Sequence, residues 1–513
     1  MSVDPVTLEV ARNRLSAIAD EMGVVLRRTS YSPNIKERAD CSAAVFVPGG
    51  EMLAQAEHIP VHLGSMPASV AAVLNTFGAT PGVQYAVNDP YHGGTHLNDL
   101  TLVRPVHVGT RHIGWVANRA HHADVGGGAP GSMPSDAVRI DQEGIVVPPM
   151  AAVLHGEWLD EFVGPFLAAT RTPAERLGDL SAQLGANEAG AARLAAVATE
   201  MGLDRFAAIS HALLDYGERR MRAALLALPD GTYRFGDVME WGPDDLHIDV
   251  KVTIDGDELH ADFAGTHDQI AGNINAVEAV TRSCLYFAVR VATDPEIPAN
   301  GGCYRALHLD APAGSLVNAL PPAAVAAGNV ETSQRIADVI LGALAPAAPD
   351  RVPAAGQGTM NNVLIGSDDF AYYETIAGGQ GARPDRPGQS GIHTGMTNTK
   401  NTPIESLETH YPFSVTRYRL RSGSGGDGLH RGGDGIEREI EFNAPAVVSL
   451  MGERRRVPPW GLAGGRPGAC GEDWLIRGGE RTRLAGKTTF AVEPGDRLLV
   501  LTPGGGGWGA PLA

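Results

Sequence analysis

The chain has 513 residues, which is enough for about two to four domains of ordinary size. Hydrophobic residues make up 43% and charged residues 19%, whereas 64 glycines and 35 prolines exceed ordinary usage and indicate a folded, loop-rich protein. The formal charge is −18, and no basic run is longer than Arg454–Arg456. This charge argues against a nucleic-acid partner, because binding to phosphate backbones requires a basic surface.

The N-terminal sequence and the cysteines predict a location in the reducing cytoplasm. The chain does not open with a basic stretch followed by an apolar one, and no apolar run approaches the roughly 20 residues of a membrane span. The four cysteines are scattered and lack C-x-x-C spacing, so we expect neither a disulfide framework nor a thiolate zinc site.

The first predicted element is a helix from Pro5 to Thr29, because apolar residues recur there at spacings of three and four and Asp4 stands at the capping position. Pro33 ends the helical pattern, and a sharp turn at Asp40 follows. The next predicted elements are strands at 43–47, 85–87, 100–107 and 113–116.

A helical region is predicted from Thr172 to about Leu228, since threonine at the cap, Pro173 and Glu175 combine two start signals. From Tyr233 the apolar residues alternate, which predicts a hairpin that turns at Asp255-Gly256. The remaining predictions are helices at 275–291 and 333–344, and short strands and turns over 415–501.

Histidines and acids gather near the N-terminus, where eight of the 17 histidines precede position 123. Imidazole nitrogen and carboxylate oxygen are ligands for zinc, manganese or iron, and a catalytic site needs about three of them with one position open. The candidates are His58, His62, His92, His96, Asp99, His121, His122 and Asp124.

A hairpin that turns near Thr110 brings two of these candidates together. Strands joined by a tight turn there pair residues whose numbers sum to about 220, so Asp99 faces His121. His96 lies three residues before Asp99, in the loop after Gly93 and Gly94, and we expect it to be able to fold back to the same point. A shift of one residue would turn one of the pair to the other face, and the neighbours His121 and His122 point in opposite directions.

A structural role is the alternative for each of these side chains. A single histidine in such a cluster is more often a hydrogen-bonded structural residue than a ligand. Asp40 is a further candidate, with a role in forming the turn or capping as its alternative.

Together the elements predict an α+β fold of several closely packed mixed lobes, with helical N-terminal segments, a metal-bearing β-hairpin region and a strand-rich C-terminal part. The closest match to a domain boundary is the alanine- and proline-rich stretch 345–355. The predicted regions are 1–170 with the metal site, 171–230 as helical, 231–345 as mixed α/β, and 346–513 as glycine-rich and strand-rich.

The glycine-rich segments predict turns and no nucleotide site. Gly486-Lys487-Thr488 superficially matches a phosphate loop, but Arg481 stands where that loop needs glycine, and a β-like segment follows. We interpret the other clusters as tight turns with positive φ, with loops around a ligand as the alternative. They lie at 126–128, 378–381, 423–428 and 504–507, and the polar segment 398–405 either lines a pocket or caps a helix.

Long motifs extend along the whole chain. They are Arg27–Ser32 with Glu37–Ser42, His58–Met66, Asn88–Tyr91 with Gly93–Leu97, Ala120–Gly127, Gly328–Arg335 and Thr502–Gly509. Together they resemble the motifs of the hydantoinase B/oxoprolinase family, and the resemblance covers essentially the whole chain.

The resemblance implies a B-type subunit of an ATP-dependent hydrolase that opens a cyclic amide such as a hydantoin, 5-oxoproline or a lactam. In such enzymes ATP is bound by a separate A-type subunit, which phosphorylates the substrate, while the B-type subunit carries a metal ion. The family's ligands correspond to Asp40, His96, Asp99 and His121. Asn98 departs from the family pattern, in which proline is common at this place.

On this basis we expect one divalent ion, zinc or manganese with iron as an alternative, and ATP bound by an A-type partner in a hetero-oligomer such as A2B2. The expected substrate is a small cyclic amide, and neither nucleic acid nor a membrane is an expected partner. His122 or His62 is the candidate to move the proton. The alternatives are a carboxylase subunit that acts on a ketone and a non-catalytic, metal-binding scaffold.

Overall fold

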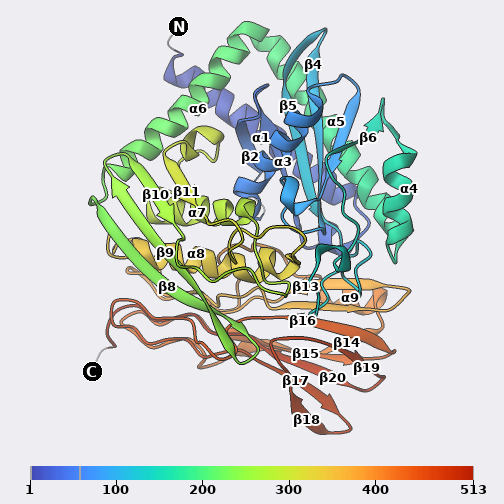
Figure 1. Ribbon diagram of the computed structural model, residues 1–513, viewed down its shortest axis with the longest axis vertical. Coiled ribbons are helices and arrows are strands. Elements are labelled where there is room, and N and C mark those ends of the chain that lie inside the picture. Colours follow the sequence, from blue (N-terminus) through green and yellow to red (C-terminus); the bar gives the residue numbers. More distant parts are fainter. Residues whose placement is uncertain (1–2, 57–58, 512–513) are drawn as a thin grey trace.

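A computed structural model gives the fold of residues 3–56 and 59–511 (Figure 1). Within these residues the strands form one seven-stranded sheet, two four-stranded sheets and one five-stranded sheet, with helices packed between and around them. The predicted α+β class is therefore confirmed. Among residues 3–56 and 59–511, no helix is long and apolar enough to cross a membrane.

The seven-stranded sheet belongs to the N-terminal part of the chain, and its strand order is β2-β1-β5-β4-β3-β6-β7. The predicted strands are present, and β5 is longer at both ends than the sequence indicated. The strands are β1 (Cys41–Phe46), β2 (Met52–Ala56), β3 (Val83–Val87), β4 (Asp99–Val108), β5 (Arg111–His121), β6 (Met150–Leu154) and β7 (Glu157–Trp158).

Helices cover both faces of this sheet. On one face, α1 (Pro5–Thr29) and α5 (Pro173–Met201) pack against β1, β4 and β5, and on the other lies α3 (His62–Phe77). The first helix is confirmed with its cap, because the Asp4 carboxylate accepts a hydrogen bond from the backbone N–H of Thr7 at 2.9 Å. Sequence reasoning missed α3, since Pro67 lies inside it and obscures the helical pattern.

The predicted helical region contains two long helices, α5 and α6 (Leu203–Leu225), and α4 (Asp160–Ala169) precedes it. Helix α5 begins at Pro173 as predicted. Thr172 is the N-cap residue as predicted, but its side chain makes no capping hydrogen bond. Gly202, with φ of 83°, separates α5 from α6.

The first four-stranded sheet has the order β11-β10-β9-β8. The predicted hairpin is confirmed, since β9 ends at Asp255 and β10 begins at Glu258. The sheet packs on α8 (Ser333–Leu344), which in turn packs on α7 (Glu278–Ala292). The strands are β8 (Gly231–Trp241), β9 (Asp244–Asp255), β10 (Glu258–Asp262) and β11 (Leu307–Asp310).

Helix α7 begins three residues later than Asn275, where the sequence placed its start. The Asn275 side-chain N–H groups instead donate to the backbone carbonyls of Ile270, Gly272 and Ala324, at 3.0, 2.6 and 3.0 Å. Asparagine side chains that bind nearby backbone in this way compete with helix formation.

The C-terminal part lies below the rest in Figure 1 and contains two sheets, one with the order β13-β12-β16-β19 and one with β14-β15-β20-β17-β18. The β-like segment after Gly486 is confirmed as β19. The elements are β12 (Asn362–Gly366), β13 (Ala371–Thr375), α9 (Ile404–His410), β14 (Phe413–Arg421), β15 (Gly435–Phe442), β16 (Ala446–Met451), β17 (Glu472–Arg477), β18 (Glu480–Arg483), β19 (Lys487–Val492) and β20 (Arg497–Leu501).

Several glycine-rich segments of this part form what we call the glycine layer, residues 378–381, 425–433, 461–468 and 504–507. Their backbones pack directly on one another: Gly505 N–H donates to Gly433 O at 2.9 Å, and Gly433 N–H donates to Gln380 O at 2.8 Å. A Cβ on Gly505 would lie 2.0 Å from Gln380 O. The expected positive φ is present at Gly423 but wrong for 504–507, where close approach of backbones is the reason for glycine.

The expected boundary at 345–355 contributes Ala345 and Ala348 to a buried hydrophobic cluster that also contains residues of the first two sheets. The limits of the four predicted regions stay a prediction.

We predict that Gly505→Ala destabilises the protein by about 1–3 kcal/mol, the usual cost of forcing an atom into a packed core. The control is Gly185→Ala, because Gly185 lies within α5 and a Cβ there meets nothing within 4 Å. This control should gain up to about 1 kcal/mol from helix propensity. The measurement is the unfolding midpoint of the wild type and of the two variants. A Gly505→Ala midpoint equal to that of the wild type would contradict the close packing described for the glycine layer.

Candidate metal centre

The candidate metal centre lies at one end of the seven-stranded sheet, where β1, β5 and β4 run side by side. Asp99 pairs with His121 across β4 and β5, so the predicted register is confirmed. Cys41 pairs with Ala120 across β1 and β5, and the N–H of His121 donates to the carbonyl of Asp40 at 3.1 Å. Asp40, His121 and Asp99 therefore form a row across three strands.

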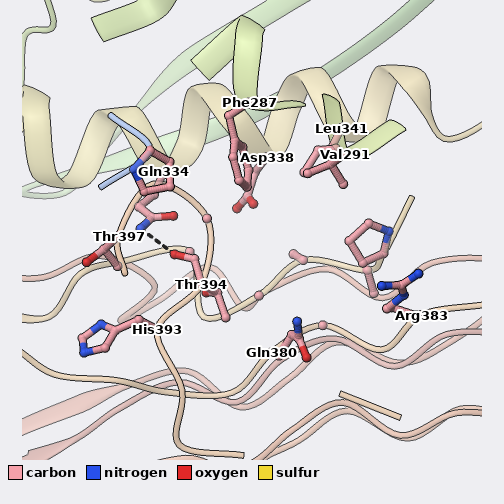
Figure 2. Close-up of a pocket in the computed structure, with 18 of the residues that line it drawn as sticks. Phe287, Val291, Gln334, Asp338, Leu341, Gln380, Arg383, His393, Thr394 and Thr397 are labelled. Carbon is pink, nitrogen blue, oxygen red and sulfur yellow. Dashed lines mark hydrogen bonds between the residues drawn. The ribbon is translucent and has the colours of Figure 1, made fainter. Parts of the chain in front are cut away.

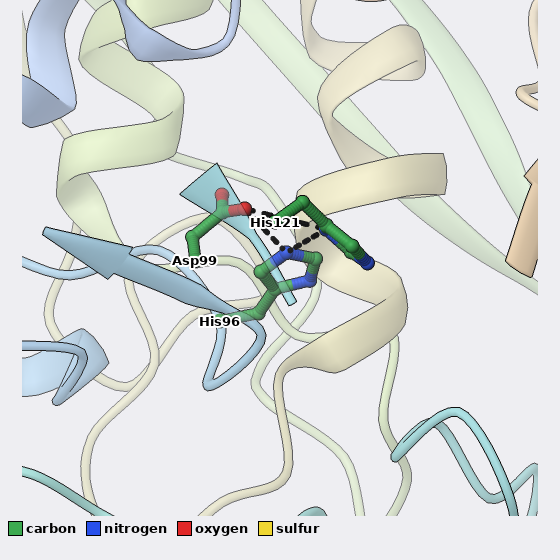
Figure 3. A group of neighbouring side chains, drawn as sticks. All are labelled: His96, Asp99 and His121. Atoms are coloured by element: carbon green, nitrogen blue, oxygen red, sulfur yellow. Dashed lines mark hydrogen bonds and ion pairs between the residues drawn. The ribbon is translucent and has the colours of Figure 1, made fainter. Parts of the chain in front are cut away.

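His96 completes a compact triangle with two residues of this row (Figure 3). Its Nε2 lies 3.2 Å from His121 Nδ1 and 3.2 Å from Asp99 Oδ1. His121 Nδ1 lies 3.3 Å from the same oxygen. All three side chains are buried.

The triangle has the size and chemistry of a metal site. Three ligands at about 2.1 Å from a tetrahedral ion stand about 3.4 Å apart, close to the separations seen here. Two imidazoles and one carboxylate suit zinc, manganese or iron. Burial alone would raise the pKa of Asp99, but His96 and hydrogen bonds from His121 and His62 hold it well below its usual value. The carboxylate is thus a buried anion aimed at two ring nitrogens.

The second oxygen of Asp99 is held in place by other residues. Oδ2 accepts a hydrogen bond from Thr95 Oγ1 at 2.7 Å and lies 3.3 Å from His62 Nε2. The other ring nitrogen of His62 is 2.8 Å from Ser42 Oγ, and burial lowers the pKa of His62. Contacts of this kind fix the direction of a ligand. His62 therefore orients Asp99.

Asp40 lies beside the triangle without belonging to that compact group. With Asp99, His121 and Tyr373 it lines a small cavity of about 20 Å³. That is room for about one water molecule. The Asp40 carboxylate, at the end of the row across the strands, therefore faces this small cavity.

The other histidines of the N-terminal cluster lie elsewhere. The side chain of His122 binds Gln183 of α5, at 2.9 Å from Nε2 to Oε1, and burial lowers its pKa to about 4. His92 is 62% exposed and pairs with Asp89. Asp124 pairs with Arg171. His58 lies outside the described residues. Of the two residues expected to move a proton, only His62 contacts the triangle.

Asn98 helps to hold the loop that carries His96. Its side-chain N–H groups donate to the carbonyls of His122 at 2.9 Å and Gly131 at 3.1 Å. These bonds tie the loop that carries His96 to the end of β5 and to the turn at Gly131.

Two residues from later in the chain complete the surroundings of the triangle. Asn329, in the π-helical turn η4 (Gly328–Thr332), has its Nδ2 3.2 Å from His96 Nε2 and 3.5 Å from Asp99 Oδ2. Tyr373 stacks on His121 with ring centres 4.5 Å apart. Sequence reasoning missed both as site residues, although Asn329 lies in the motif Gly328–Arg335. Nothing in the sequence marked Tyr373.

A larger cavity of about 490 Å³ shares a wall with the small one, and Figure 2 shows side chains that line it. Thr397 lines both cavities, and its hydroxyl is buried without a hydrogen-bond partner among the described residues. The walls also carry the amide side chains of Gln334 and Gln380, and His393, whose pKa burial lowers to about 3. Asn398 belongs to the walls too, so the start of the segment 398–405 lines a pocket.

The fold and the buried centre define a class of mixed α/β proteins with two histidines and an aspartate at one end of a sheet. The chain belongs to the hydantoinase B/oxoprolinase family, whose profile matches residues 4–511.

Similar proteins share nearly the full length of this chain. It is 40% identical to 5-oxoprolinase 1 of Arabidopsis thaliana over 99% of the chain, which spans 42% of that longer relative. It is 31% identical to the B-type subunit of a putative D-/L-hydantoinase from a Pseudomonas species, over 99% of this chain and 90% of the other. The ATP-dependent caprolactamase of Pseudomonas jessenii superposes with a TM-score of 0.93 at 30% identity, over 99% of this chain and 92% of that one.

We predict that His96→Ala and Asp99→Ala each remove a bound divalent ion, because either change deletes one corner of the triangle. His122→Ala is the matched control, since it removes a neighbouring buried imidazole that faces the other way. Elemental analysis of the purified variants should give about one ion per chain for the control and little for the other two. Full metal content in both triangle variants would exclude this site.

Proposed function

We propose that this chain is the B-type subunit of an ATP-dependent hydrolase that opens a cyclic amide. The triangle of His96, Asp99 and His121, buried next to a cavity of about 490 Å³, is the observation that carries the proposal. The names of the similar proteins, a 5-oxoprolinase, a B-type hydantoinase subunit and a caprolactamase, support the substrate class.

The chemistry divides between two subunits. An amide bond is stabilised by resonance, and phosphorylation of its oxygen by an A-type partner makes the carbonyl carbon susceptible to water. His96, Asp99 and His121 would hold zinc or manganese, with Asp40 beside them at the small cavity, and the ion would supply a Lewis acid that lowers the pKa of water. His62 fixes the orientation of the Asp99 carboxylate. His122 lies on the other face of the sheet, where it binds Gln183 and has a structural role.

ATP binding belongs to the partner in this scheme. The segment that superficially matches a phosphate loop leads into β19, and Lys487 forms an ion pair with the buried Glu453. A lysine engaged in this way does not reach a phosphate. The B-type chain thus supplies the hydrolytic half of the reaction.

The adjoining cavity suits a small ring. Its volume lies in the range of about 300–1,000 Å³ that holds small molecules. A cyclic amide offers one N–H donor and one C=O acceptor, and the side chains of Gln334 and Gln380 offer both kinds of partner. Thr397 brings a hydroxyl to the boundary with the metal centre.

Reconstitution tests the proposal directly. The purified chain is assayed alone and with an A-type subunit, with ATP and a panel of a hydantoin, 5-oxoproline and caprolactam, and in a parallel arm with a ketone and labelled bicarbonate. We expect ring opening coupled to ATP hydrolysis only when both subunits are present. Label incorporated from bicarbonate would favour the carboxylase alternative, and micromolar ATP binding by this chain alone would contradict the division between subunits.

We predict that Thr397→Val lowers kcat/KM about 2- to 10-fold, the effect of losing one neutral hydrogen bond, with metal content unchanged. Thr402→Val is the control, because the Thr402 hydroxyl is also buried without a hydrogen-bond partner among the described residues but does not line the cavity. Steady-state kinetics of the reconstituted enzyme separate the two variants. Equal kcat/KM values for the two variants would mean that the substrate does not contact the Thr397 hydroxyl.

A further inference from the structure

A second group of metal-ligating side chains lies on the first four-stranded sheet, far in sequence from the buried centre. Strands β10 and β11 are parallel, and His260 pairs with His308 across them. Glu258 precedes His260 by two residues and so shares its face of the sheet. The intervening Leu259, like Ala261, is buried in the core. Glu258, His260 and His308 therefore project together from the outward face.

The three side chains lie within reach of one ion. The rings of His260 and His308 are stacked, with centres 4.3 Å apart and an interplanar angle of 21°. His308 Nε2 lies 3.5 Å from Glu258 Oε2. One ligand atom from each of the three residues lies within 4.8 Å of the others. Ligand atoms of a tetrahedral ion stand about 3.4 Å apart, so binding would draw these three atoms together by side-chain rotation.

The polar atoms of this group are only partly used within the protein. His308 Nε2 is enclosed and has no hydrogen-bond partner among the described residues. Arg222 of α6 occupies the other oxygen of Glu258, with Nη1 3.3 Å from Oε1. This contact leaves Oε2 of Glu258 facing the imidazoles. Arg222 thus orients the Glu258 carboxylate, as residues behind a metal ligand commonly do. Arg222 is itself balanced by Glu218 at 3.0 Å and Asp257 at 3.3 Å.

We propose that Glu258, His260 and His308 form a second metal site, for a late divalent transition ion such as Zn²⁺, Ni²⁺ or Cu²⁺. Two imidazoles and one carboxylate favour these ions over Mg²⁺ and Ca²⁺, which prefer oxygen ligands alone. The side chains of His308 and Glu258 are 40% and 43% exposed, so the ion exchanges with solvent and binds more weakly than in the buried triangle.

Such an ion would join two strands. β11 is the edge strand of its sheet and has only four residues. An ion shared by His308 and the two ligands of β10 fastens this short strand to its neighbour. Binding to the folded state alone raises stability with ion concentration.

Zinc titration of the metal-free full chain tests the site. Calorimetry of the wild type should show a tight step and a weaker one, each of about one ion per chain. His260→Ala and His308→Ala should each weaken the second step at least tenfold and leave the first unchanged. Mg²⁺ in place of Zn²⁺ should give no second step.

His211→Ala is the matched control, because His211 is a single exposed histidine outside the group, and it should behave as the wild type. Zinc binding in which no step is weakened by His260→Ala or His308→Ala would overturn the proposal, whether or not the buried triangle binds zinc. Hydrolase activity does not enter this readout, so the result is independent of the proposed function.

Discussion

The pairing of β5 with β4 on one side and β1 on the other fixes the geometry on which the metal centre depends. These pairings place Asp40, His121 and Asp99 in one row. The register is enforced by the core, because Ala44 and Ala117 face one hydrophobic cluster while Val45 and Val116 face the other. A slip of one residue would exchange these faces and place valine where alanine packs, and alanine where valine packs, in both clusters. Hydrophobic packing remote from the site thus determines where the ligands point.

A buried polar cluster of this kind needs partners for nearly every atom, since an unpaired polar group in the interior is costly. His62 and Thr95 hold the second oxygen of Asp99, and Asn329 approaches it and His96 from the turn η4. Glu143 contributes at a distance by accepting hydrogen bonds from the N–H groups of Val325 and Ala326, just before that turn. Burial raises the pKa of Glu143 to about 8. Three distant stretches of the chain meet at one point.

The sequence was informative where a contact is local. Asp99 and His121 could be paired because a tight turn relates their positions by simple counting. Placing Asp40 beside them requires the pairing of β1 with β5, which no turn specifies, and here only the family resemblance pointed to it. Thr397 and Tyr373 approach from the C-terminal part, and no pattern in the sequence marked them. The sequence predicted positive φ for the glycines of 504–507, whereas the structure shows close approach of neighbouring backbones. Both situations require glycine, so the sequence alone does not separate them.

Anomalous diffraction from crystals of the metal-loaded protein, collected at the absorption edge of the bound ion, tests the central claim most directly. The account predicts a peak about 2.0–2.2 Å from His96 Nε2, His121 Nδ1 and Asp99 Oδ1, with Asp40 as the further carboxylate nearest to it. The metal-free protein should show no peak there. A peak bound elsewhere in a fully loaded crystal, with the triangle empty, would contradict the assignment of the centre and with it the proposed hydrolytic role.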